Sequence, residues 1–306
     1  MSSLSANNIS QLRNSMRFRP AVCIFYFLIA AFVGLIIASV IMGVVLAKGA
    51  TTPSLRIASV TQDLLVFILP AAITAIIVNQ LPARLLAVDR GVDCRMFFLA
   101  CLLYFCGTPM LEIVVKLNDA MTLPPFLNDI EQWMRQMEGS AREQVKLLLG
   151  SESVADLVVS ILIVGVMAGF SEELFFRGVL QRLLESTRLG PHAAIWITAT
   201  LFSAFHMQFF GFFPRLILGA YFGYLLWWSG SIWLPVAIHI LNNTLVVAMQ
   251  WAGAESDTPL TDGTLSDSFG SMALSFGSTT LLLASLISSA ALIRLLVLRS
   301  QSLRKC

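Results

Sequence analysis

Long apolar runs separated by short polar segments dominate this chain. A helix needs about 20 apolar residues to cross the hydrocarbon core of a bilayer. Eight runs approach or exceed that length, at residues 21–47, 58–80, 96–116, 154–176, 192–210, 213–229, 232–252 and 276–298. The pattern therefore predicts an all-α polytopic membrane protein with about eight transmembrane helices.

The composition supports the same class. Of the 306 residues, 57% are hydrophobic and only 12% are charged, whereas a soluble domain carries about 25% charged residues. The mean hydropathy is +0.80. The net charge of +2 and the lack of a basic stripe outside the loops argue against a nucleic-acid partner. The lipid bilayer is the partner that the composition predicts.

The distribution of basic residues predicts how the chain is oriented. Cytoplasmic loops of membrane proteins are enriched in Lys and Arg. With the N-terminus in the cytoplasm, most basic residues fall in cytoplasmic segments, and an even number of spans returns the C-terminus to the same side. The basic residues on that side are Arg13, Arg17, Arg19, Arg84, Arg90, Arg95, Arg182, Arg188, Arg299, Arg304 and Lys305, whereas the short outer loops keep only Lys48, Arg56 and Arg215. Both termini are therefore expected in the cytoplasm.

The chain divides into four segments along this pattern. Residues 1–20 form a cytoplasmic N-terminal segment, and 21–153 hold three transmembrane helices and an outer loop. Residues 154–252 form a core of four helices, and 253–306 hold an acidic outer loop, the last transmembrane helix and a basic tail. The loop after the third span is amphipathic, because its apolar residues recur at helical spacing against charges. We expect an interfacial helix there.

Two adjacent glutamates and an arginine stand out near the end of the fourth apolar run, in the stretch GFSEELFFRGVLQ at 169–181. One charge within the bilayer costs about 2.5–3.5 kcal/mol on insertion scales, so charges in such runs are functional candidates. Glu173 and Arg177 are four residues apart and can pair across one turn. Glu172 is rotated by about 100° from Glu173 and faces another neighbour. A purely structural Glu173–Arg177 clamp is the alternative.

Three more polar residues lie on neighbouring helices. His206 falls late in the fifth span, and His239 lies in the seventh, four residues before Asn243 on the same helix face. At a rise of about 1.5 Å per residue, counting from the connecting turns places these residues at the depth of the two glutamates. For this to hold, the fourth helix must continue as one long rod beyond its apolar part.

These residues carry a resemblance to a known family. The Glu172–Gly178 stretch resembles the EExxFRG signature of the CPBP family of CAAX-processing and bacteriocin-processing (Abi-type) intramembrane proteases. Phe202 with His206 is similar to its FxxxH motif, and His239 with Asn243 to its HxxxN motif. The motifs occur in the family's order, and the resemblance covers about 155–250.

The resemblance implies an intramembrane endopeptidase that hydrolyses a peptide bond of a membrane-associated substrate, prenylated or of the leader type. It implies that Glu172 is the general base that takes a proton from water and that His206 holds the same water. A carboxylate shielded from bulk water is well suited to such a role. No cofactor is needed in this glutamate-dependent scheme.

The same resemblance assigns roles to the other motif residues. Glu173 and Arg177 would fix the surroundings of the base. His239 and Asn243 would donate hydrogen bonds to the oxyanion of the tetrahedral intermediate, a contribution whose loss typically costs about 10²–10³ in rate.

Other functions use the same residues differently. Glu172, His206 and His239 could ligate zinc and leave one position open for water. Protonatable residues inside a membrane also suit a proton-coupled transporter. Against the transporter, the polar residues lie at one level rather than along a path. The family resemblance also implies a third role, because its members include immunity factors and scaffolds.

Overall fold

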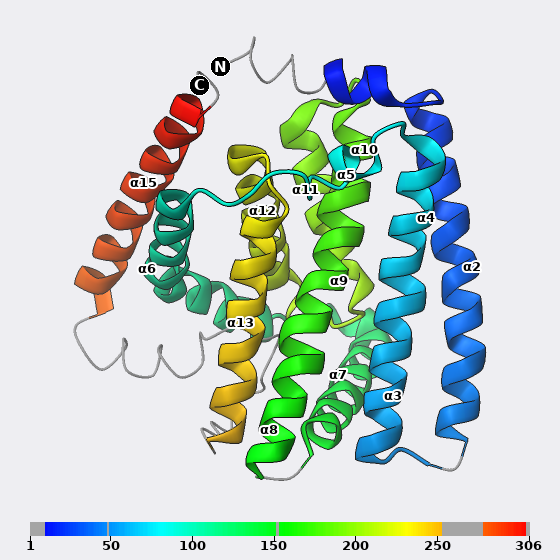
Figure 1. The fold of residues 1–306 in the computed structure, drawn as a ribbon. Helices are drawn as coiled ribbons and strands as arrows, with labels where there is room; N and C mark the ends of the chain where they lie inside the picture. Colours follow the sequence, from blue (N-terminus) through cyan, green and yellow to red (C-terminus); the bar gives the residue numbers. More distant parts are fainter. Residues whose placement is uncertain (1–9, 48, 151–152, 253–277, 304–306) are drawn as a thin grey trace.

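The computed structural model describes residues 10–47, 49–150, 153–252 and 278–303. Within these ranges the chain forms helices and one isolated bridge between Met16 and Asn79, and it contains no strand (Figure 1). The expected all-α membrane fold is thus confirmed. The acidic outer loop expected after the seventh span lies outside the described residues.

The first two membrane helices start where the sequence gives start signals. Pro20 occupies the first turn of α2, a position that suits proline because no intrahelical hydrogen bond is needed there. Thr51 and Ser54 cap the second helix reciprocally. The elements are α2 (Pro20–Leu46), α3 (Thr52–Gln62), the π-helical segment η1 (Asp63–Ile68), α4 (Leu69–Val78) and the short α5 (Pro82–Leu85).

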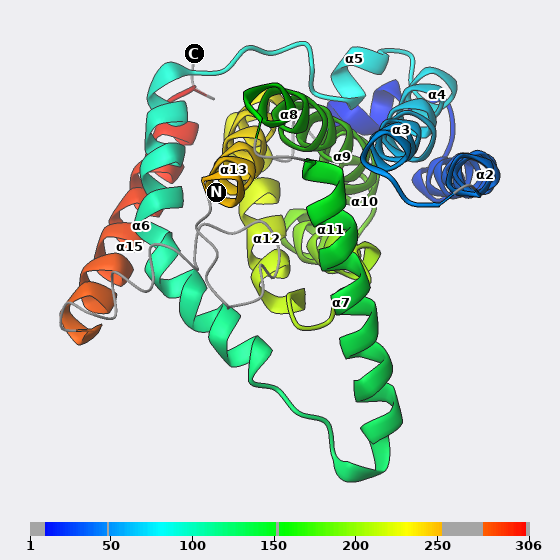
Figure 2. The same cartoon turned by 90° about the horizontal axis from the view of Figure 1, so that it is seen from below.

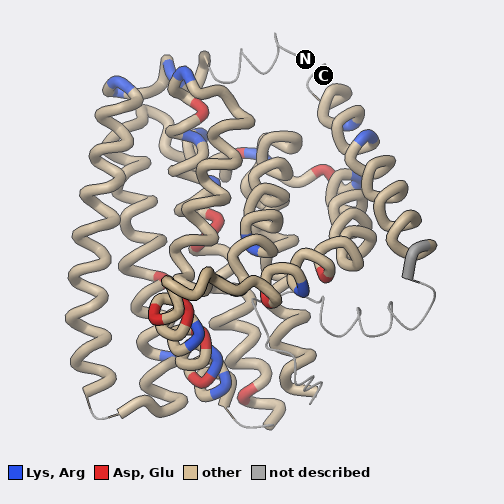
Figure 3. Tube along the Cα trace, turned by 180° about the vertical axis from the view of Figure 1, so that it is seen from behind, with Lys and Arg blue, Asp and Glu red and all other residues tan. Residues whose placement is uncertain are grey.

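The third membrane helix and the amphipathic helix follow. Asp93 accepts a hydrogen bond from the Met96 backbone N–H and so caps α6 (Cys94–Asp119). A 3-10 turn, η2 (Pro125–Leu127), leads into α7 (Asn128–Leu149). Charged residues line α7, in contrast to the apolar membrane helices (Figure 3). Seen from below, α11, α12 and α13 lie between the two arms formed by α6 and α7 (Figure 2).

The fourth membrane helix is one continuous rod from Val154 to Glu185. Its parts are α8 (Val154–Ser160), η3 (Ile161–Ala168), α9 (Gly169–Glu173), η4 (Leu174–Gln181) and α10 (Arg182–Glu185), of which η3 and η4 are π-helical. The helix extends nine residues beyond the predicted end at 176. The continuous fourth helix, which is needed to place the two glutamates at the depth of the histidines, is therefore present.

The remaining described helices complete the bundle as α11 (Gly190–Phe205), α12 (Phe212–Ser229), α13 (Trp233–Trp251) and α15 (Ser278–Leu303). Six of the described helices are long and apolar enough to cross a membrane. The predicted fifth and sixth spans are also helical, as α11 and α12, but they are not among these six. α11 ends at Phe205 rather than near residue 210. The total of eight spans stays a prediction.

Close helix contacts position the site. α9 and η3 pack against α13, and α11 packs against α12. A Cβ atom on Gly169 would lie 3.2 Å from the backbone nitrogen of Ile240, so a larger residue here would force the two helices apart by a few tenths of an ångström. The contact brings the helix that carries the glutamates against the helix that carries His239.

Candidate active site

A buried ion pair forms the centre of the site. Arg177 Nη1 donates to Glu173 Oε1 over 2.6 Å, and both side chains are fully buried. Arg177 Nη2 donates to the Gly219 carbonyl of α12 over 3.0 Å. The guanidinium also lies over the rings of Phe202 and Phe222, 4.4 and 5.3 Å from their centroids. Charge-assisted hydrogen bonds and cation–π contacts thus join η4 to α11 and α12.

His239 links the two glutamates. Its Nδ1 lies 2.9 Å from Glu173 Oε1, and because a carboxylate only accepts, Nδ1 carries the hydrogen. The ring stacks on Phe222 at a centroid distance of 4.7 Å. His239 Nε2 lies 3.8 Å from Glu172 Oε2. The imidazole is therefore held by Glu173 on one side and presented to Glu172 on the other.

The environments of the adjacent glutamates differ. The side chain of Glu173 is fully buried, whereas that of Glu172 is 15% exposed. The 3.8 Å between Glu172 and His239 is too long for a hydrogen bond. An oxygen atom about 2.8 Å from each of the two atoms fits this gap. Glu172 is therefore the carboxylate that can meet a water molecule or a substrate.

His206 is the first residue after α11. Its Nδ1 donates to the Phe202 carbonyl over 2.9 Å, which leaves Nε2 as the acceptor in the neutral ring. The Phe202 ring packs edge-on against both histidines, with centroids 5.1 Å from His206 and 6.0 Å from His239. The structure therefore brings His206 next to the ion-pair cluster through one shared aromatic ring.

A buried arginine that the sequence pattern assigned to an outer loop secures His206. Arg215 lies in the first turn of α12 and is 4% exposed. Its guanidinium donates to the Ser203 and Gln208 carbonyls, over 3.3 Å each, on either side of His206. Arg215 stands one residue after Pro214 in a short turn, so its position alone suggested a solvent-facing residue.

Asn243 belongs to a chain of hydrogen bonds across three helices. Tyr104 of α6 donates to Asn242, Asn242 Nδ2 donates to Asn243 Oδ1, and Asn243 Nδ2 donates to the Val164 carbonyl of η3. An amide nitrogen carries two hydrogens, so one remains for another acceptor. Sequence reasoning did not identify Tyr104 or Asn242, because a lone tyrosine or asparagine in an apolar run carries no specific signal.

Asp63 lies elsewhere than the apolar pattern indicated. Hydropathy placed it near the outer end of the second span, but the helix begins at Thr52, so Asp63 lies well inside it. The side chain is 3% exposed. Its Oδ1 is 3.0 Å from Ser171 Oγ, on the residue that precedes Glu172. A third carboxyl group therefore stands beside the site.

Among the described residues, no group of three or more His, Cys, Asp or Glu side chains is arranged to hold a metal ion. The zinc site proposed as an alternative, from Glu172, His206 and His239, is thus not formed as a ready ligand set in this structure. Its test is a chelator experiment.

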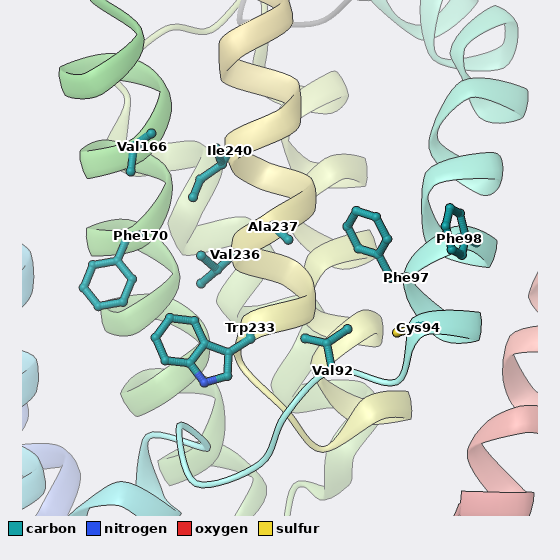
Figure 4. A pocket seen from close by; sticks show the side chains of 10 residues that line it. All are labelled: Val92, Cys94, Phe97, Phe98, Val166, Phe170, Trp233, Val236, Ala237 and Ile240. Carbon is teal, nitrogen blue, oxygen red and sulfur yellow. The ribbon is translucent and has the colours of Figure 1, made fainter. Parts of the chain in front are cut away.

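An apolar cavity of about 670 Å³ opens between α6, α13 and the helix that carries the glutamates (Figure 4). Phe170 and Trp233 stack at one end with centroids 6.0 Å apart. His239 lies on the same helix α13 as four of the lining residues, so the cavity and the polar cluster share this helix. The lining residues are Val92, Cys94, Phe97, Phe98, Val166, Phe170, Trp233, Val236, Ala237 and Ile240.

Comparison with known families agrees with these features. Residues 154–245 match the family model described as type II CAAX prenyl endopeptidase Rce1-like. The match covers less than a third of the chain and includes all six candidate site residues. No curated protein and no solved structure matches the chain. Over this segment the chain is similar to the CAAX-processing (CPBP) proteases, which agrees with the resemblance carried by the three motifs.

Proposed function

We propose that this protein hydrolyses a peptide bond of a prenylated, membrane-associated substrate with a water molecule activated by Glu172. One observation carries the proposal. The partly exposed Glu172 faces His239 across a gap that fits one oxygen atom, beside a fully buried Glu173–Arg177 pair. The family match supports the coarser conclusion of a CAAX-type intramembrane protease.

The proposed reaction starts with a water molecule that donates one hydrogen to Glu172 and the other to His206 Nε2. Glu172 removes its proton as the water oxygen attacks the carbonyl carbon of the scissile bond. The same proton then passes from Glu172 to the leaving amine as the carbon–nitrogen bond breaks. General-base catalysis of this kind contributes about 10²–10⁴ in rate.

The oxyanion of the tetrahedral intermediate needs donors. The hydrogen of Asn243 Nδ2 that is not given to Val164 is one candidate. His239 Nε2 is the other, and because Nδ1–H is given to Glu173, Nε2 donates only while the ring carries both protons. Each such donor is worth about 10²–10³ in rate.

Glu173 and Arg177 have a supporting role in this scheme. Their ion pair fixes His239 from the side opposite Glu172, and the Arg177 guanidinium holds Phe202 against both histidines. Pre-organised donors and bases need no rearrangement at the moment of reaction, which is a large part of enzymatic rate enhancement.

The apolar cavity supports the choice of a prenylated substrate. Its lining is almost wholly hydrocarbon and aromatic (Figure 4), and part of that lining comes from α13, the helix that carries His239. An isoprenoid chain next to the scissile bond suits such a surface. We further propose that the basic segments, and with them both chain termini, lie in the cytoplasm.

The test compares the purified wild type with Glu172→Gln on a farnesylated CAAX-type peptide, with and without a strong chelator. Gln keeps the shape of Glu but cannot act as a base. Glu112→Gln is the matched control, because Glu112 is a buried membrane glutamate that pairs with Lys116 instead. We expect Glu172→Gln alone to lower kcat by about 10²–10⁴.

Each outcome has a clear meaning. Cleavage that survives the chelator but not Glu172→Gln supports the glutamate scheme. Cleavage that the chelator abolishes and zinc restores supports the zinc alternative. Equal cleavage by the wild type and Glu172→Gln overturns the proposed role of Glu172.

A further inference from the structure

Asp63 is a buried carboxyl group on a helix that the family match does not include. It is the first residue of the π-helical segment η1, and η1 packs against α9, which carries Glu172. Asp63 Oδ1 lies 3.0 Å from the hydroxyl of Ser171, the residue that immediately precedes Glu172. π-Helical segments occur frequently at functional sites.

The charged groups around Asp63 offer it no cation among the described residues. The elements that contact η1 most are α2, α3, α4, α9 and η4, and Phe67 of η1 also packs against Phe205 at the end of α11, a helix with no Lys, Arg, Asp or Glu. α2 and α4 contain no charged residue. Arg56 of α3 pairs with Asp156, and Arg177 of η4 pairs with Glu173 of α9. Glu172 is thus the remaining charged neighbour, and it has the same sign.

Hydrogen bonding indicates which form Asp63 takes. Ser171 Oγ lies 3.0 Å from Asp63 Oδ1 and 3.1 Å from the Ala168 carbonyl. A hydroxyl has one hydrogen, so it cannot donate fully to two acceptors. If Asp63 carries a proton, it donates to Ser171, and Ser171 donates to Ala168. Both contacts are then good hydrogen bonds.

We propose that Asp63 is a positioning residue that holds the single proton of a carboxyl pair with Glu172, so that Glu172 stays ionised as the base. Two nearby carboxylates in apolar surroundings do not both ionise easily, and one proton relieves their repulsion. The proton on Asp63 is also tied into the Ser171 hydroxyl, which fixes the backbone turn that bears Glu172. The catalytic consequence rests on the proposed function.

The experiment measures the proton directly, by infrared spectroscopy of the purified protein at neutral pH. A protonated carboxyl has a carbonyl stretch distinct from the carboxylate and amide bands, and it shifts in heavy water. The proteins are the wild type, Asp63→Asn, Glu172→Gln and Glu112→Gln. Glu112 is ion-paired with Lys116, so its removal should leave this band unchanged.

The expected result is a protonated-carboxyl band that Asp63→Asn removes and Glu112→Gln leaves unchanged. Peptidase assays complete the test. Asn can donate to Ser171 as the protonated acid does, so Asp63→Asn should keep kcat within about threefold, whereas Asp63→Leu should lower kcat at least about tenfold with KM unchanged.

Three results would overturn the inference. The spectrum of Asp63→Asn could equal that of the wild type, which would place the proton elsewhere, or the wild type could show no protonated-carboxyl band. A kcat of Asp63→Leu equal to that of the wild type would show that Asp63 does not position Glu172. Because the infrared band does not depend on proteolysis, a wild type that cleaves no peptide would refute the proposed function and still leave the proton assignment decided.

Discussion

Removal of Arg177 is the sharpest test of how the site is held together. Arg177→Met replaces the guanidinium with an apolar side chain of comparable length and leaves Glu173 fully buried with His239 as its partner. Breaking a buried ion pair from one side costs about 3–5 kcal/mol, because the remaining charge is stranded. The loss of the hydrogen bond to the Gly219 carbonyl contributes to this cost.

A double-mutant cycle isolates the interaction energy between Glu173 and Arg177 from the other contacts that each side chain makes. Arg177→Met and Glu173→Gln should each destabilise the protein, but the double variant should lose less than their sum. Residues in direct contact show coupling energies of about 0.5–3 kcal/mol, and a fully buried pair at 2.6 Å should lie near the upper end. The double variant carries neither charge, so no stranded charge remains.

The assay is the free energy of unfolding in mixed micelles, titrated with a denaturing detergent. Glu112 and Lys116 provide the control cycle, since they have the same spacing but the lysine side chain is 50% exposed. Exposed pairs contribute about 0–1 kcal/mol, so this second cycle should show little coupling. If the Glu173–Arg177 cycle is additive within about 0.5 kcal/mol, the buried pair is not the structural centre described above.

Three further outcomes follow from the same contacts. Arg215→Met should release the turn that carries His206 and lower kcat at least about tenfold while the helical content, measured by circular dichroism, stays unchanged; wild-type kcat would contradict this. Asp93→Asn should cost about 1 kcal/mol of unfolding free energy at neutral pH. Because hydrogen bonds from Arg299 lower the pKa of Asp93, this stabilisation is present at neutral pH and is lost as the pH falls through that lowered pKa, so the two proteins should converge in stability in acid; a difference that persists there would contradict the assignment. Ala237→Phe should partly fill the apolar cavity and raise KM for a farnesylated peptide at least about fivefold with kcat unchanged; an unchanged KM would exclude the cavity as the isoprenoid site.

The membrane helices were predictable because apolar length is a direct physical requirement. The ends of α2, α6 and α13 lie within three residues of the predicted spans. The second span was placed too late, because its first turns, TPSLRIASVTQ, are too polar to enter an apolar window. Because the predicted start of the span was too late, Asp63 was placed near the end of the helix, although it lies in its interior.

Counting residues along the helices predicted that the polar residues lie at a similar depth. It did not predict which of them contact one another. Helical spacing paired Glu173 with Arg177. It could not show that His239 contacts both glutamates, since the rotation of α13 depends on its packing against Gly169. Arg215 was assigned to a loop because a charged residue beside a turn usually faces water, yet here the backbone carbonyls around His206 bind it.

The most direct measurement for the central proposal is a single-turnover cleavage of a farnesylated CAAX-type peptide in ¹⁸O-labelled water by the wild type and by Glu172→Gln. The wild type should release the C-terminal fragment and place one labelled oxygen in the new carboxylate of the prenylated product. Glu172→Gln should do so at least about 10² times more slowly. Labelled product formed at the same rate by both proteins would show that Glu172 is not the base.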